Sequence, residues 1–230
     1  MSPSHGRSKP RTRLPLDSVL IIAQDNQTPD SYNPLQPQDG EDCLFLTVTA
    51  PPDAQNLPVS VWFFGGGLLF NSMQEFDPQP IVNFANNSII GISVQYRPAM
   101  FGFLNSPAMG DGMNAGLKDC VAALEWIQQY VHLFGGDPNM VTIGGESAGA
   151  GIVLNLLAAQ GVPGRPQLFH GAFLDSPGMP PQSACDTGIW AEQWRQITGI
   201  LGCDIDDADC VRNSDTRKLR ILNSDVSIRD

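Results

Sequence analysis

A serine lies between two glycines at the point where a run of strand-forming residues meets a run of helix-forming residues. Residues 141–150 read Val-Thr-Ile-Gly-Gly-Glu-Ser-Ala-Gly-Ala, which places the pattern Gly-x-Ser-x-Gly at Gly145, Ser147 and Gly149. Because the glycines lack a Cβ, the chain can turn sharply and expose the Ser147 hydroxyl above the end of a sheet. The same turn directs the backbone N–H of Ala148 toward the place where a substrate oxyanion would form. The pattern therefore predicts a serine nucleophile for acyl transfer.

Three consecutive glycines form a second feature with chemical potential. Gly65, Gly66 and Gly67 follow a buried-strand pattern over residues 59–64. Without side chains, their backbone N–H groups can approach a ligand closely. Two such donors, together with the N–H of Ala148, would make a three-donor oxyanion hole.

Strand patterns alternate with helix patterns along most of the chain. Alternating and continuous apolar runs predict strands at residues 19–22, 44–48, 59–64, 89–96, from 141 onward, and at 171–175. Apolar residues at helical spacing predict helices at 115–131, 148–159 and 189–201, and a break in the chain at 135–138. This alternation indicates an α/β fold with a mostly parallel sheet covered on both faces. We expect residues 1–38 to be a poorly ordered leader and 39–230 to form a single partial domain.

Composition excludes several classes of partner. The 230 residues contain 13 Lys and Arg against 24 Asp and Glu, a formal charge of −11 that disfavours binding to nucleic acid or to anionic membranes. No apolar run approaches the roughly 18 residues of a membrane span. The basic N-terminus has no hydrophobic segment after it, so no signal peptide is recognisable. We find no metal-ligand cluster, nucleotide loop or prosthetic-group motif and expect no cofactor and no metal. The sequence does not indicate an oligomeric state.

Two further features concern covalent modification. The chain has five cysteines, so at least one is unpaired within it. Two Asn-x-Ser/Thr triplets, Asn26-Gln-Thr28 and Asn86-Asn-Ser88, are compatible with glycosylation if the protein is secreted.

Seven motifs in matching order give the chain a resemblance to the type-B carboxylesterase family, which includes cholinesterases and fungal lipases. The similarity is greatest to the fungal lipase and esterase branch and covers roughly residues 40–222. The motifs are Glu41-Asp-Cys-Leu-Phe-Leu46, Val61-Trp-Phe-Phe-Gly-Gly-Gly67, Val94-Gln-Tyr-Arg97, Gly102-Phe-Leu104, Asn114-Ala-Gly-Leu-Lys-Asp119, Phe134-Gly-Gly-Asp-Pro138 and Gly145-Glu-Ser-Ala-Gly149.

The resemblance implies an α/β-hydrolase fold, truncated at both ends, and a carboxylic ester hydrolase acting on a small-molecule or lipid ester. It implies that Ser147 is the nucleophile, that Gly66, Gly67 and Ala148 donate to the oxyanion, and that Glu146 shapes the pocket beside the nucleophile. It further implies a structural ion pair between Arg97 and Asp119 and a disulfide between Cys203 and Cys210. Family analogy suggests secretion.

Some positions depart from the family pattern. Phe64 stands where many members have His or Tyr, and Cys120 stands where Gln is usual. Asp175 and Pro177 replace Gln and Gly behind the turn that carries the serine. Cys43 matches a family disulfide cysteine whose partner lies upstream, yet residues 1–42 contain no cysteine.

The catalytic acid and base of this fold follow the serine in the chain. None of the 83 residues after Ser147 matches the family's acid or histidine motif, and we do not expect His5, His132 or His170 to act as the base. The sequence therefore leaves two alternatives open beside an esterase, namely a catalytically inactive interaction protein and a truncated gene product. We also expect one sheet edge to expose apolar surface, because the strands beyond it are not recognisable.

Overall fold

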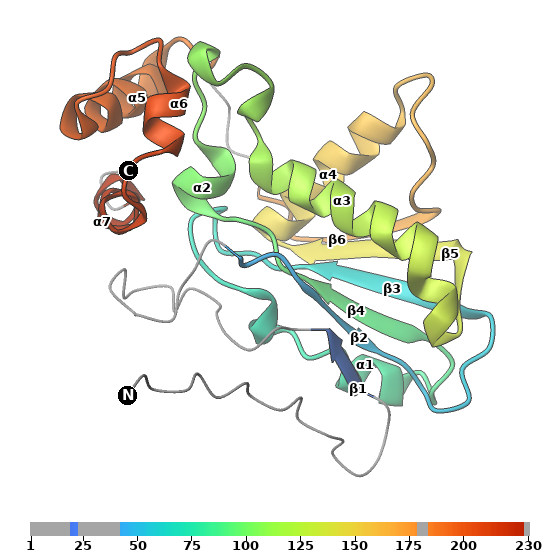
Figure 1. Ribbon diagram of the computed structural model, residues 1–230. Coiled ribbons are helices and arrows are strands. Elements are labelled where there is room, and N and C mark those ends of the chain that lie inside the picture. Colours follow the sequence, from blue (N-terminus) through green and yellow to red (C-terminus); the bar gives the residue numbers. More distant parts are fainter. Residues whose placement is uncertain (1–18, 23–41, 179–183, 228–230) are drawn as a thin grey trace, which may run out of the picture.

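The computed structural model describes residues 19–22, 42–178 and 184–227 and contains a mixed six-stranded sheet (Figure 1). Across the sheet the strands run in the order β1 (Val19–Ile22), β2 (Leu46–Thr49), β4 (Ile90–Val94), β3 (Leu57–Phe63), β5 (Gly136–Glu146) and β6 (Gly171–Asp175). The four strands β4, β3, β5 and β6 are parallel to one another, whereas β2 pairs antiparallel with both β1 and β4. The prediction of a mostly parallel α/β sheet is confirmed.

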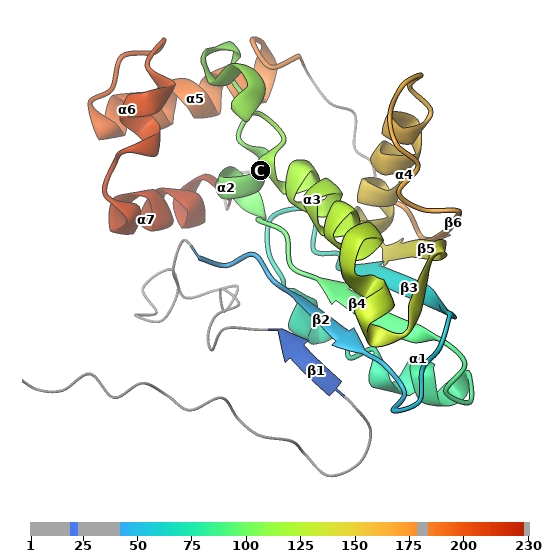
Figure 2. The same cartoon turned by 45° about the vertical axis from the view of Figure 1, so that its right-hand side comes forward.

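Helices cover both faces of this sheet (Figures 1 and 2). The long helices α3 (Ala115–Tyr130) and α4 (Ala148–Gln160) lie on one face, and α1 (Gln79–Phe84) lies on the other. The pleat of β4 explains the division. A Cβ added to Gly91 would meet Pro78 and Val82, which belong to the α1 side, while the neighbouring Ile90 contacts the opposite side near Gly136.

The core lies between the central strands and α3 and α4. All five residues of β4 are buried, and the largest fully buried side chains include Tyr96, Phe63 and Phe64. In contrast to the buried central strand β4, β6 is the edge strand of the sheet within the described residues, and Phe173 on it is 57% exposed. This agrees with the expectation that one edge exposes apolar surface.

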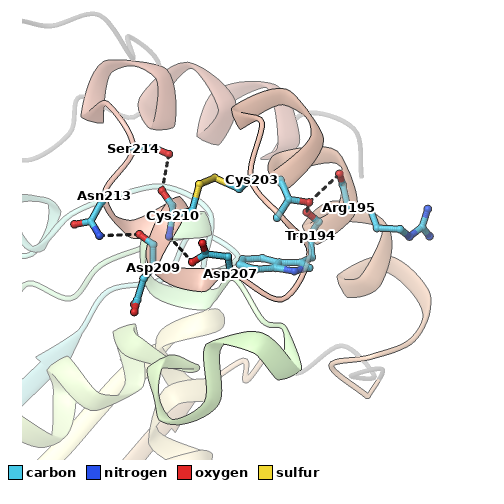
Figure 3. The surroundings of a disulfide bond; sticks show 9 residues. Trp194, Arg195, Cys203, Asp207, Asp209, Cys210, Asn213 and Ser214 are labelled. Carbon is cyan, nitrogen blue, oxygen red and sulfur yellow. Dashed lines mark hydrogen bonds between the residues drawn. A yellow bond between two sulfur atoms is a disulfide. The ribbon is translucent and has the colours of Figure 1, made fainter.

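A second, smaller core joins the C-terminal helices to residues 100–109, which follow β4. Helices α5 (Gly188–Leu201), α6 (Ala208–Arg212) and α7 (Thr216–Ser227) lie beside α2 (Ala99–Phe103). Its buried members are Leu104, Trp194, Ile197, Ala208, Val211 and Leu219. A disulfide between Cys203 and Cys210 closes the loop from α5 to α6, as the resemblance implied (Figure 3). In the same loop region, the indole N–H of Trp194 donates to the carbonyl oxygen of Ile205 at 2.7 Å.

The structure corrects the expected start of one strand and contains short elements that were not predicted. β5 begins at Gly136 rather than at Val141, so the break expected over 135–138 is wrong except at Gly135, whose φ of 80° turns the chain. The early start arises because Leu57 pairs with Gly136, with an irregularity between Leu57 and Val59. Helices α1, α2, α6 and α7 and the short 3₁₀ segments Met73–Glu75, Pro107–Gly112 and Val131–Phe134 were not predicted.

The expected leader lies outside the described residues except for β1, and the division at residue 38 stays a prediction. Among the residues that the structure describes, no helix is long and apolar enough to cross a bilayer. In the same part of the chain, no three His, Cys, Asp or Glu side chains are grouped to hold a metal ion.

Candidate active site

Ser147 occupies a turn between the end of β5 and the first residue of α4. Its backbone angles are φ 53° and ψ −119°, a conformation that side-chain-bearing residues rarely adopt. The turn is fixed on both sides of the serine. The N–H of Ser147 donates to the carbonyl oxygen of Asp175 at 2.9 Å, and the carbonyl oxygen of Ser147 accepts from Gly151 at 3.0 Å and Gly178 at 2.8 Å. The strained residue is therefore held by β6, by α4 and by the loop after β6.

The two glycines of the motif are required by close backbone contacts. A Cβ on Gly145 would lie 2.4 Å from the carbonyl carbon of Gly149. A Cβ on Gly149 would lie 2.1 Å from the carbonyl oxygen of Phe63, at the end of β3. Both glycines thus allow the start of α4 to pack directly on the ends of two strands.

The glycine loop after β3 lies against this turn. A Cβ on Gly65 would meet Oε2 of Glu146 at 2.8 Å and the Cβ of Ser147 at 3.3 Å. Gly66 and Gly67 both have positive φ, 102° and 66°, which a side chain would strain. The structure therefore brings the glycine loop and the serine turn together, as the motifs predicted.

The backbone N–H groups of Gly66 and Gly67 have no backbone partner in the described part of the chain and could serve as donors to an anion. The carbonyl oxygen of Gly66 is occupied by the N–H groups of Leu69 at 3.0 Å and Phe70 at 3.3 Å. Within the described residues, the N–H groups of Gly66 and Gly67 form no backbone hydrogen bond. Ala148 is the first residue of α4, so its N–H also lacks a partner inside the helix. The three N–H groups remain available to an oxyanion, and the helix N-terminus adds favourable electrostatics.

Tyr96 anchors the base of the glycine loop. Its hydroxyl donates to the carbonyl oxygen of Phe64 at 2.7 Å, and the two rings stack with centroids 4.0 Å apart. Burial raises the pKa of the Tyr96 phenol, so the hydroxyl stays protonated as a donor. Phe64, which departs from the family pattern, thus serves as a stacking partner inside the core. The Tyr96 anchor was missed because its effect depends on a contact across the sheet.

Residues after β6 complete the wall beside the serine. A Cβ on Gly178 would lie 3.5 Å from the Oγ of Ser147, so this loop lines the hydroxyl. Ser176 donates its hydroxyl to the Asp175 carboxylate at 3.0 Å and so points toward its own strand. Glu146 is exposed on the other side, with its carboxylate beside Gly65. The role of Gly178 was not predicted, since only the pairing of β6 with β5 brings it to the serine.

The two described histidines lie far from Ser147. His132 belongs to the 3₁₀ segment before β5, at the opposite end of that strand from the serine. The N–H of His170 donates to the carbonyl oxygen of Val141. At about 3.3 Å per residue, the six-residue step from Val141 to Ser147 spans roughly 20 Å, so neither imidazole reaches the hydroxyl. His5 lies outside the described residues.

An ion pair connects the end of β4 to α3 behind the site. The Arg97 guanidinium donates to Asp119 through Nε at 2.7 Å and Nη2 at 2.6 Å, and the Arg97 backbone N–H donates to the same carboxylate at 3.1 Å. The Asp119 side chain is 5% exposed, and that of Arg97 is 37% exposed. The hydrogen bonds that Arg97 donates to Asp119 raise the pKa of the Arg97 guanidinium, which therefore stays charged. The structure thus brings this predicted pair together as a brace and not as part of the serine site.

Two of the free cysteines lie near this brace. Cys120 is fully buried next to Asp119, and burial raises the pKa of its thiol, so it packs as a small apolar side chain. Cys43 is half-buried, and burial raises its thiol pKa while the nearby Arg97 partly opposes that shift.

Comparison with known proteins places these features in context. Residues 21–226 match the carboxylesterase family. The chain is 37% identical over 202 residues to Lipase 4 of Diutina rugosa, an alignment covering 81% of this chain and 36% of the relative. It is 31% identical over 217 residues to the cocaine esterase of Homo sapiens, covering 88% of this chain and 37% of the relative. The chain thus spans little more than a third of the length of these relatives.

Solved structures show the same likeness. The structure of Aspergillus niger EstA superposes with a TM-score of 0.72 at 34% sequence identity, covering 82% of this chain and 37% of that one. A thermophilic PNB esterase also has a TM-score of 0.72, at 30% identity, covering 84% of this chain and 39% of that one.

Proposed function

The chain belongs to the carboxylesterase family, and from that membership we propose that it contributes the nucleophile and the oxyanion hole of a serine carboxylic ester hydrolase. Ser147 is the nucleophile, and the backbone N–H groups of Gly66, Gly67 and Ala148 are the oxyanion donors. Its substrate is an ester of a carboxylic acid, small-molecule or lipid.

The single observation that best supports this proposal is the backbone of Ser147. A positive φ at a serine is costly, on the order of 1–3 kcal/mol, and persists only where surrounding structure enforces it. Here three hydrogen bonds and two glycine contacts enforce it. An interaction protein would have no use for a strained, half-exposed hydroxyl directed beside three backbone donors. This argues for the hydrolase over the inactive alternative.

The reaction proceeds in two acyl transfers. The Oγ of Ser147 forms a bond to the ester carbonyl carbon while its proton passes to a general base. The carbonyl oxygen becomes negatively charged and is stabilised by the three backbone N–H groups. The C–O bond to the alcohol then breaks, and the alcohol leaves with the proton. Water attacks the acyl-enzyme in the same way and releases the acid and the free serine.

The general base is the part that the described residues do not supply. Neither His132 nor His170 reaches Ser147, and in this fold the acid and the histidine follow the serine in the chain. We propose that the base is an imidazole and that neither of these two histidines supplies it. Removing such a base costs on the order of 10⁶ in turnover, although the oxyanion hole and binding continue to help.

Exposed apolar side chains beside the donors support an apolar substrate group. Leu69 and Phe70 follow the glycine loop after Leu68 and are 39% and 42% exposed. An acyl or alcohol chain lying over this loop would cover them.

A fluorophosphonate probe tests the assignment of the nucleophile. The Ser147 oxygen bonds to the phosphorus of such a probe, the P–F bond breaks and fluoride leaves, and the hydroxyl proton passes to a base; the phosphoryl oxygen of the adduct then occupies the oxyanion site. We expect one adduct, located by peptide mass spectrometry on Ser147, and its loss in Ser147→Ala. Ser176→Ala is the matched control, because Ser176 is exposed, also has positive φ and lies close by. Labelling that survives Ser147→Ala, or that is equal in urea-unfolded chain, would refute the proposal.

Free imidazole tests the assignment of the missing base. Added imidazole should accept the Ser147 proton and increase the labelling rate in proportion to its concentration. The free base of an imidazole predominates above a pKa of about 6.5, so the acceleration should grow as pH rises through that value and then level off. The readout is the adduct on Ser147, which excludes direct reaction of imidazole with the probe. If the rate of Ser147 labelling at pH 8 did not depend on imidazole concentration, a base would not be what limits the reaction, and the proposal would be contradicted.

A further inference from the structure

A turn on the far side of the sheet contains the triplet Asn86-Asn87-Ser88. Helix α1 ends at Phe84, and Asn86 and Asn87 follow with positive φ of 51° and 59°. The N–H of Asn86 donates to Asn83, that of Asn87 to Val82 and that of Ser88 to Ala85, and the Ser88 hydroxyl also donates to the Ala85 carbonyl at 2.6 Å. All three residues of the triplet are exposed. The acceptor amide is therefore presented on an ordered turn.

Phe84 on the same turn is unusual for its exposure. It is 89% exposed, the most exposed large hydrophobic side chain among the described residues. Asparagine tolerates the left-handed backbone, so the turn alone accounts for Asn86 and Asn87. The turn does not account for an aromatic ring in water two residues before the acceptor.

We propose that Asn86 is an N-glycosylation site and that the first sugar packs on the ring of Phe84. A pyranose ring presents C–H groups on one face, and an exposed aromatic ring offers that face an apolar surface. In the transfer, the amide nitrogen of Asn86 bonds to C1 of the sugar of a lipid diphosphate-linked oligosaccharide. The bond from C1 to the diphosphate oxygen breaks, the lipid diphosphate leaves, and the amide gives up one proton.

Two other observations agree with this modification. The Cys203–Cys210 disulfide forms in oxidising compartments, and oligosaccharide transfer to asparagine belongs to the same secretory route. The turn also precedes β4, whose first residue, Ile90, pairs with Val59 of β3 at the amino ends of the parallel strands. Ser147 follows the carboxyl end of β5, so a glycan on Asn86 leaves the serine site open. Figures 1 and 2 show α1 at the end of the sheet remote from α2 and α5.

The test uses the full chain behind a cleavable secretion signal, translated with endoplasmic-reticulum microsomes. Protease protection identifies the translocated chains, and N-glycosidase release with peptide mass spectrometry locates the glycan. Asn26→Gln serves as the background, so that only the second triplet is read. We expect a glycan on Asn86 that is lost in Asn86→Gly and in Ser88→Ala. The matched control Asn87→Gly accepts the same backbone, leaves Asn-x-Ser intact and should retain the glycan. Translocated chains with unmodified Asn86 would overturn the proposal.

Phe84→Ala tests the contact with the sugar. Enzymatic deglycosylation should lower the Tm of the chain by about 2–4 °C, the shift expected for a single aromatic contact in a chain of this size. In Phe84→Ala that difference should vanish. If deglycosylation lowered the Tm of the parent chain and of Phe84→Ala equally, the stacking of the sugar on Phe84 would be refuted. Whether Asn86 is glycosylated is decided separately, by the glycan mass on Asn86.

Discussion

Gly149→Ala is expected to destabilise the chain by about 2–3 kcal/mol and to slow the labelling of Ser147 by on the order of 10². The added methyl would lie 2.1 Å from the Phe63 carbonyl oxygen and 2.8 Å from that of Phe64. Both obstacles are backbone atoms of the strand end, so no side-chain rotation relieves the clash. Alanine gains up to about 1 kcal/mol over glycine inside a helix, which offsets only part of the overpacking cost.

The slower labelling has a separate cause from the loss of stability. Pushing α4 away from β3 moves Ala148 and its N–H away from the glycine loop. Displacement of a catalytic group by about 1 Å is enough to cost on the order of 10² in rate. Urea unfolding measures the stability, and adduct formation on the folded fraction measures the geometry.

Gly199→Ala is the matched control, because it makes the same change inside α5 where nothing lies within 4 Å of the added methyl. There we expect a gain of roughly 0.5–1 kcal/mol and unchanged labelling. If Gly149→Ala also proved neutral, the close approach of α4 to β3 would be wrong.

The serine turn and the glycine loop could be predicted from sequence because their geometry is local. Glycine on either side of Ser147 specifies the turn wherever the rest of the chain lies. Their proximity was predicted by motif, and the structure accounts for it through the pairing of β3 with β5.

Other parts of the site depend on contacts that no local pattern encodes. Gly178 reaches the serine only because β6 pairs with β5, and the carbonyl oxygen of Asp175 accepts from Ser147 for the same reason. The early start of β5 at Gly136 likewise follows from pairing with Leu57. Short helices such as α1 and α6 offer too few residues for a periodic signal, and they are stabilised by the surfaces on which they pack. Sequence reasoning therefore reached the proposed nucleophile and missed the tertiary contacts that hold it.

Arg97→Ala is expected to cost about 3–5 kcal/mol, more than the opposite truncation, Asp119→Ala, at about 1–3 kcal/mol. The asymmetry follows from burial. Arg97→Ala leaves a carboxylate that is 5% exposed without its two guanidinium donors. Asp119→Ala leaves a guanidinium that is 37% exposed, which regains water and loses correspondingly less.

Urea unfolding of the two variants measures this difference, with Asp209→Ala as the control. Asp209 pairs with Arg212 at 2.7 Å, but both side chains are exposed, at 80% and 47%, so we expect a cost below about 1 kcal/mol. Equal costs for Arg97→Ala and Asp119→Ala would show that the strength of the pair, and not desolvation of the carboxylate, sets the free-energy cost.

Because the brace joins β4, the strand beside β3, to α3, its loss should weaken the whole sheet. Fluorophosphonate labelling of Ser147 should then fall only in proportion to the unfolded fraction, which separates a structural brace from a residue that touches the reacting ester.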